Sequence, residues 1–204
     1  LITLISDKLI SQLNKGNKMS KNLVKIEGVH HVAYRCRDAE QTRWFYEDVL
    51  GLKLAAAMSF DHVSGTDKEM KYMHVFFEMS DGNYIAFFDD PHNAPSDFFK
   101  DMNGFDSHIA VQVKSLTDLE KVKEQLNSVG WDSFTIDHEF VTSLYIFDPN
   151  GIQLEFTCRA KDHDQIMEED ANKAHKELEQ WTEETRGLKL EKFGNEALDL
   201  REKT

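Results

Sequence analysis

The segment SHIAVQV, residues 107–113, decides the fold of this chain, because it repeats a segment near the N-terminus, HHVAYRC at residues 30–36. In both segments apolar side chains alternate with small or polar ones, which is typical of a β-strand with two different faces. Each segment is followed by a stretch with helical spacing, at residues 38–50 and 116–129. The chain therefore contains an internal repeat that starts with a strand and a helix.

The ends of the two predicted helices carry suitable residues. Asp38 and Ser115 have short oxygen-bearing side chains that cap the first backbone N–H groups of a helix. Gly51 and Gly130 follow the helices and favour their termination. Local sequence thus agrees with the repeat in both halves.

Three strand-like segments follow each helix, and a short turn joins the last two of each set. The chain is therefore expected to be α+β, with two βαβββ modules at about residues 26–90 and 104–158 and a linker near 89–106. The predicted strands are 53–60, 71–79 and 83–88 in the first half, and 131–140, 142–147 and 152–158 in the second.

The regions outside the modules differ in composition. We expect one domain over residues 25–160, preceded by an N-terminal extension at 1–24, of which the part before Met19 is not native. Residues 161–204 are expected to form an acidic helical extension. Apolar residues recur at helical spacing over about 162–185, and we expect this helix to pack on the domain or on a second subunit.

Charge and composition exclude several classes of partner. The formal net charge of −13 disfavours nucleic acid and anionic membranes, and the apolar runs are too short to span a bilayer. Two cysteines are too few for a disulfide framework, so a cytoplasmic location is the default expectation. The expected partners are a small-molecule substrate and further copies of the chain, as a homodimer or a higher homo-oligomer.

The inward faces of the strands carry candidate metal ligands. Aligning the first strands pairs His108 with His31, and aligning the turn glycines Gly82 and Gly151 pairs Glu155 with Ala86. A histidine on a strand is more often structural than a ligand, but here three ligand types occupy equivalent places. Two imidazoles and one carboxylate leave coordination positions open, which suits Fe(II), with Mn(II) or Zn(II) as alternatives.

Two longer stretches resemble the vicinal oxygen chelate superfamily, which includes glyoxalases, fosfomycin-resistance transferases, epimerases, bleomycin-binding proteins and extradiol dioxygenases. The first segment of the superfamily's sequences resembles HVA at residues 31–33 followed by WFYEDVLGL at residues 44–52. Their closing strand resembles DPNG at residues 148–151 followed by Glu155. The resemblance implies a curved, open-barrel sheet around a metal cavity.

A sharper resemblance links the second half to type I extradiol ring-cleaving dioxygenases. IDH at residues 136–138, LY at 144–145, DPNG and Glu155 match their signature segment. The resemblance implies that His138 and Tyr145 contact catechol hydroxyls and that Glu155 binds iron. That family also uses a histidine as an acid/base catalyst, and the repeat alignment offers His74 for this role. Most type I enzymes carry two pairs of modules, whereas this chain has one, so the substrate cannot be carried over.

The expected function is therefore a metal-dependent, extradiol-type dioxygenase that cleaves a catechol-like molecule with O2. Glyoxalase, epimerase or fosfomycin-type thiol-transferase chemistry on the same fold is the first alternative. Glyoxalases and epimerases generally use a fourth ligand where this chain has Ala86, which counts against them. A metal-free protein that binds a small molecule and confers resistance is the second alternative.

Overall fold

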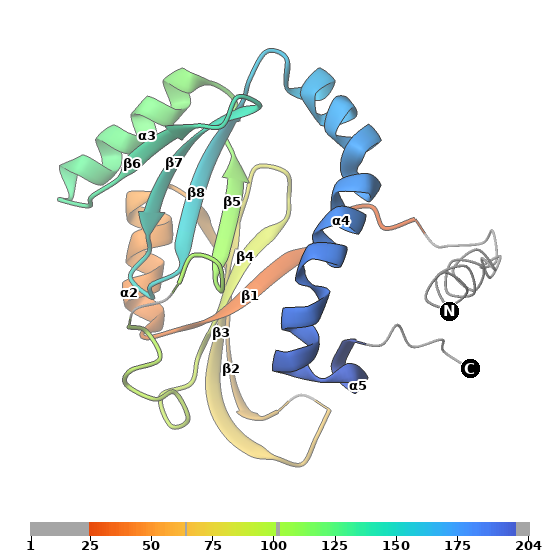
Figure 1. Ribbon diagram of the computed structural model, residues 1–204. Coiled ribbons are helices and arrows are strands. Elements are labelled where there is room, and N and C mark those ends of the chain that lie inside the picture. The colour runs from red at the N-terminus through yellow and green to blue at the C-terminus, as the bar shows by residue number, and fades with distance from the viewer. Residues whose placement is uncertain (1–24, 64, 101–102, 199–204) are drawn as a thin grey trace, which may run out of the picture. The chain divides into compact units, whose positions relative to one another are not determined.

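The computed structural model describes residues 25–63, 65–100 and 103–198, and the chain forms two units, Leu1–His30 and His31–Thr204. In the first unit, residues 25–30 carry no helix or strand. The predictions for residues 1–24 lie outside the described residues. The second unit contains both repeats and the C-terminal helices (Figure 1).

The second unit has the predicted α+β class, with two four-stranded mixed sheets that do not close into a barrel. The first sheet has the order β1-β4-β3-β2 and the second the order β5-β8-β7-β6, so the two repeats have the same topology. In each sheet the first strand is parallel to the last, and the other neighbours are antiparallel. The strands are β1 (His31–Cys36), β2 (Lys53–His62), β3 (Glu69–Glu78), β4 (Tyr84–Asp89), β5 (His108–Gln112), β6 (Phe134–Asp137), β7 (Val141–Phe147) and β8 (Gln153–Arg159).

The pairing registers confirm the repeat alignment. In the first sheet Ala86 lies opposite Phe76, and in the second sheet Glu155 lies opposite Tyr145. The parallel neighbours are equivalent as well, because Ala86 pairs with Ala33 and Glu155 with Ala110. The residue of the first repeat that is equivalent to Glu155 is thus an alanine, Ala86.

The helix of the first repeat differs from the prediction in its second half. It begins as α2 (Ala39–Arg43), capped by the carboxylate of Asp38, and continues as the π-helix η1 (Trp44–Val49). The backbone N–H of Leu50 donates to the carbonyl of Phe45, five residues earlier. The apolar spacing could not predict the wider turn, because both kinds of helix keep their apolar residues on one side.

In the second repeat, α3 (Leu116–Ser128) agrees with the prediction and is capped by Ser115. Figure 1 shows α3 lying along the second sheet, where it contacts β7 and β8. The core is shared by both repeats: Tyr46 and Phe77 from the first and Leu126 and Ile146 from the second belong to one buried cluster. The two modules are therefore parts of one packed body.

The C-terminal segment is more helical than predicted. Helix α4 (His163–Phe193) runs eight residues beyond the expected end at 185, and α5 (Asn195–Leu198) follows it. None of the described residues of α4 is buried. None of the described helices has the length and apolar character needed to cross a bilayer.

Candidate active site

One face of the second sheet carries a cluster of polar side chains around Glu155. The Nε2 atom of His108, on β5, lies 2.8 Å from Oε2 of Glu155, on β8. The other carboxylate oxygen accepts a hydrogen bond from the hydroxyl of Ser143, on β7. The same hydroxyl lies 3.2 Å from Oγ1 of Thr157. Both oxygens of this buried carboxylate are thus held in place by neighbouring strands.

The register of β7 and β8 also places Tyr145 in this cluster, directly opposite Glu155. The Tyr145 hydroxyl lies 2.8 Å from Nε2 of His138, and the rings of Tyr145 and His108 lie 6.1 Å apart. Burial raises the pKa of Tyr145 above its ordinary value, and the charge of Glu155 raises it further. The phenol is therefore protonated at neutral pH.

The position of His138 is fixed by an unusual turn between β6 and β7. The backbone N–H of Phe140 donates to the carbonyl of His138, and Glu139 between them has φ 68°. A three-residue turn with a positive φ at a residue other than glycine is strained. The strain therefore occurs directly beside a side chain of the cluster, as is common at functional sites.

A pair of histidines lies on the first sheet. The rings of His31, on β1, and His74, on β3, are 6.5 Å apart, and His74 stacks on Phe88 with ring centroids 3.8 Å apart. Among the described residues, the buried Nε2 atom of His74 has no hydrogen-bond partner. Burial lowers the pKa of His74, and the nearby His31 lowers it further.

His74 also lines a cavity of about 550 Å³ beside the first sheet. Alternation along the strands puts His31 and His74 on the same sheet face as most of the lining residues. The lining of the cavity includes Arg35, Phe60, Tyr72, His74, Phe88 and Asp90. The cavity wall is thus largely aromatic, with one ion pair at its edge.

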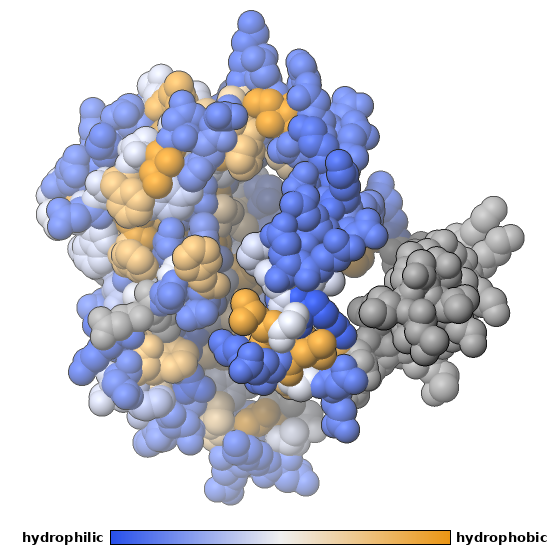
Figure 2. Space-filling model, in the orientation of Figure 1, coloured by the Kyte–Doolittle hydropathy of each residue, from blue (hydrophilic) through white to orange (hydrophobic). Residues whose placement is uncertain are grey.

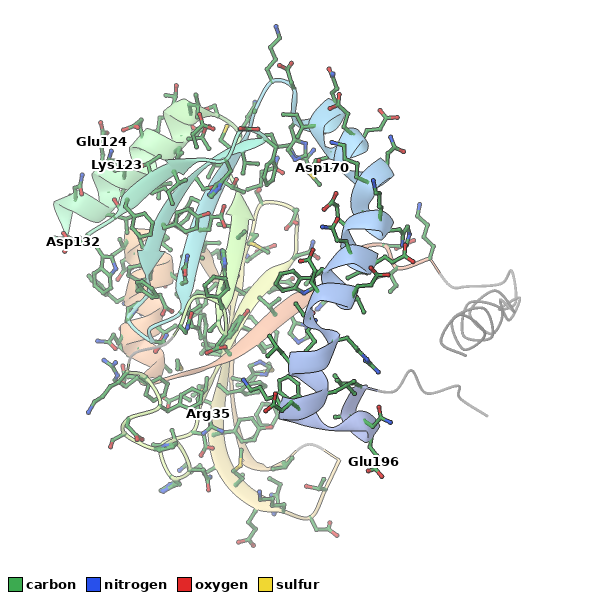
Figure 3. All side chains as sticks on the ribbon, viewed as in Figure 1. Arg35, Lys123, Glu124, Asp132, Asp170 and Glu196 are labelled. Atoms are coloured by element: carbon green, nitrogen blue, oxygen red, sulfur yellow. The ribbon has the colours of Figure 1, made fainter. Side chains whose placement is uncertain are left out.

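That ion pair joins Arg35, labelled in Figure 3, to Asp90 at 3.0 Å. The Asp90 side chain is 2% exposed and that of Arg35 is 33% exposed. Burial by itself raises the pKa of Asp90, but hydrogen bonds from Asn93 and Arg35 outweigh it, so the pKa lies below its ordinary value. The cavity therefore has a fixed, ionised edge.

Two of the three predicted metal ligands lie against each other. His108 and Glu155 approach at 2.8 Å, close to the separation of about 3 Å expected for neighbouring ligands with 2.0–2.2 Å bonds at right angles. His31 contacts His74 and Phe76 on β3. Within residues 25–63, 65–100 and 103–198, no three His, Cys, Asp or Glu side chains form a group that could hold a metal ion. The set His31, His108 and Glu155 thus stays a prediction.

Other predicted site residues can also be located. His138, Tyr145 and Glu155 lie in one cluster, whereas His74 lies with His31 on the first sheet. Sequence reasoning missed Ser143 as a partner of Glu155, although Ser143 lies two residues before Tyr145 and so on the same strand face. It also missed the pair of Arg35 and Asp90, because no local pattern links positions 55 residues apart.

Comparisons with known proteins agree with this architecture. The model of the Glyoxalase/Bleomycin resistance protein/Dioxygenase superfamily matches residues 28–156. No curated protein matches the sequence.

Solved structures show the same fold. A glyoxylase/bleomycin resistance protein/dioxygenase domain from Frankia sp. is 23% identical, with a TM-score of 0.56, over 69% of this chain and 99% of that chain. A glyoxalase/dioxygenase from Nostoc punctiforme is 22% identical, with a TM-score of 0.50, over 70% and 100%. The fosfomycin resistance protein FosX from Listeria monocytogenes, solved with Mn(II) and sulfate, is 16% identical, with a TM-score of 0.50, over 69% and 99%. The family model covers more than half of the chain, so the protein belongs to the Glyoxalase/Bleomycin resistance protein/Dioxygenase superfamily.

Proposed function

We propose that this protein is a metal-dependent, extradiol-type dioxygenase that cleaves a catechol-like small molecule with O2. The observation that carries the proposal is the contact between His138 and Tyr145, 2.8 Å, beside the contact between His108 and Glu155, also 2.8 Å. The resemblance to extradiol enzymes assigns His138 and Tyr145 to the substrate hydroxyls and Glu155 to the metal, and the repeat alignment adds His108 as a ligand.

The proposed ion is Fe(II), with Mn(II) or Zn(II) as alternatives, and its proposed ligands are His31, His108 and Glu155. When bound, such an ion supplies Lewis-acid activation of the diol and a place for O2 beside it. Its binding requires a neutral His108 whose Nε2 lone pair is free, whereas Nε2 now shares a hydrogen bond with Glu155.

The protein side chains have separate tasks in this proposal. The protonated Tyr145 hydroxyl donates a hydrogen bond to one substrate oxygen, and His138 orients that hydroxyl and contacts the second oxygen. Ser143 fixes the carboxylate of Glu155 by donating to the oxygen that His108 does not contact. The substrate is thus oriented from the second sheet.

His74 has the proton-transfer task. Its Nε2 has no hydrogen-bond partner among the described residues, so no protein group competes for its proton. Because this atom is buried, the ring has to turn toward the cavity that it lines to reach a substrate oxygen. Its lowered pKa keeps the imidazole neutral and able to accept that proton. Phe88, stacked on His74, and Phe60 and Tyr72 offer flat apolar surfaces for an aromatic ring.

Metal content and oxygen consumption test the proposal together. The protein purified without chelator is expected to contain about one iron per chain and to consume O2 with at least one member of a panel of catechols. Consumption of glutathione or another thiol without O2 uptake would instead indicate transferase chemistry. Protein that binds neither iron, manganese nor zinc would contradict the proposal and favour a metal-free binding protein.

A further inference from the structure

Helix α4 carries a regular apolar seam that the described part of the chain leaves uncovered. From Met167 to Leu188 the spacing alternates strictly between four and three residues, which is the heptad pattern of a coiled coil. The seam consists of Met167, Ala171, Ala174, Leu178, Trp181, Thr185 and Leu188.

The large side chains of this seam face solvent in the single chain. Met167 is 43% exposed, Leu178 62%, Trp181 57% and Leu188 70%. The face of α4 turned to the viewer in Figure 2 is mainly hydrophilic. Since most helices in proteins owe their stability to a packed apolar face, a 31-residue helix without a buried residue indicates that a partner is missing.

Thr185 does not interrupt the seam despite its hydroxyl. Its Oγ1 donates a 2.7 Å hydrogen bond to the carbonyl of Trp181, one turn earlier in the same helix. The polar atom is thus satisfied within α4, and the methyl group is left for packing. The seam is apolar over its whole length.

The charges beside the seam fit a second copy of the same helix in parallel orientation. The positions just before Ala171, Leu178 and Thr185 are all acidic: Asp170, Glu177 and Glu184. In a parallel pair each of these faces the residue five positions later in the other helix. Asp170 then meets His175 and Glu184 meets Lys189, so two of the three contacts join opposite or complementary groups.

An antiparallel pair of the same helices would bring like charges together. It places the acidic positions of one helix against the acidic positions of the other, so that Asp170, Glu177 and Glu184 face carboxylates. Like charges at these positions are destabilising. The charge pattern thus favours a second copy of the same helix in parallel orientation.

We propose that the seam of α4, from Met167 to Leu188, pairs in parallel and in register with the same seam of a second copy of this chain. The contact is isologous and closes as a dimer through a two-fold axis along the seam. Both βαβββ domains then lie at the same end of the coiled coil, because α4 starts four residues after β8 ends at Arg159.

The mass of the full-length protein in solution, measured by analytical ultracentrifugation, is the first test. The protein is expected to be a dimer, and Leu178→Lys is expected to weaken dimerisation at least tenfold because it puts a charge into the seam. Asn172→Lys adds the same charge outside the seam and should leave the dimer intact. A monomeric parent protein, or equal effects of the two substitutions, would overturn the proposal.

Disulfide crosslinking tests the orientation and separates this seam from a dimer formed by the βαβββ domains. Ala171→Cys is expected to crosslink to its own copy on mild oxidation, whereas Lys173→Cys, outside the seam, is not. The natural Cys36 and Cys158 are buried and serve as an internal background. Crosslinking through Leu178→Cys but not Ala171→Cys indicates an antiparallel pair, and crosslinking through neither indicates a dimer formed elsewhere; each overturns the proposal.

Charge reversal gives an independent readout. Lys189→Glu and Glu184→Lys are each expected to weaken the dimer, because each puts like charges opposite one another. The double variant restores opposite charges and should recover most of the affinity. Effects that simply add in the double variant would show that the two side chains do not face each other and would contradict the parallel register.

Discussion

The hydroxyl of Tyr46 donates a 3.1 Å hydrogen bond to Oδ2 of Asp148, which joins the π-helix of the first repeat to the turn between β7 and β8 in the second. The other oxygen of Asp148 accepts the backbone N–H groups of Asn150 and Ile152. Asn150 in turn accepts the backbone N–H of Arg37 at 2.8 Å. The turn that precedes the Glu155 strand is thus attached to the other half of the molecule.

Tyr46→Phe is expected to lower the free energy of unfolding by about 1.5–3 kcal/mol, because it removes a buried hydrogen bond to a carboxylate. Denaturant titration measures this change. A double-mutant cycle with Asp148→Ala, which removes the acceptor, provides the control, since the two residues are in direct contact. Strictly additive losses in the cycle would show that the contact contributes nothing to stability.

His108→Ala is expected to remove both the bound metal and the activity, because it deletes a proposed ligand that lies against Glu155. Metal analysis of the purified variant measures the first effect. His92→Ala, at an exposed histidine, is the matched control and should keep the metal content of the parent. A His108→Ala protein with full metal content would show that the ligand assignment is wrong.

His74→Phe is expected to leave metal content unchanged and to lower kcat by about 10²–10⁴-fold, the usual contribution of a general acid or base. The phenyl ring preserves the stacking on Phe88 and removes the unpartnered Nε2, so the free energy of unfolding should stay the same or rise. Stopped-flow oxygen uptake and denaturant titration separate the two effects. Unchanged turnover in this variant would assign His74 a purely structural role.

Asp90→Asn is expected to lower the free energy of unfolding at pH 7 by about 1–3 kcal/mol, because Arg35 loses its buried partner. The folded-state pKa of Asp90 is lowered, so its carboxylate stabilises the fold above the unfolded-state value of about 3.9. This contribution is lost as the pH falls through the folded-state pKa.

The difference between the parent and Asp90→Asn should therefore shrink as the pH is lowered below about 4. Denaturant titrations at pH 7 and at acidic pH measure it. Asp97→Asn, at an exposed aspartate, is the control and should change stability little at either pH. A difference that is the same at every pH would show that the charge of Asp90 is not the cause.

The sequence by itself determined the elements and their order, because these depend on local chemistry. Asp38 and Ser115 cap their helices as predicted, and Gly51 and Gly130 have φ of 78° and 72°, a backbone conformation that glycine adopts without strain. The repeat alignment, which matched Glu155 with Ala86, was also readable in advance because the turn glycines Gly82 and Gly151 mark the same point in both repeats.

Only the tertiary structure decided which of those residues meet. The contact of His108 with Glu155 spans 47 residues, and that of Arg35 with Asp90 spans 55. Strand periodicity gives the face on which a side chain lies, but the distance between two side chains depends on how the strands pair and pack. The sequence also left open what covers α4, since a pattern along one chain records an apolar face without its partner. It predicted the π-helix as an ordinary helix for a local reason, because both kinds of helix keep their apolar residues on one side.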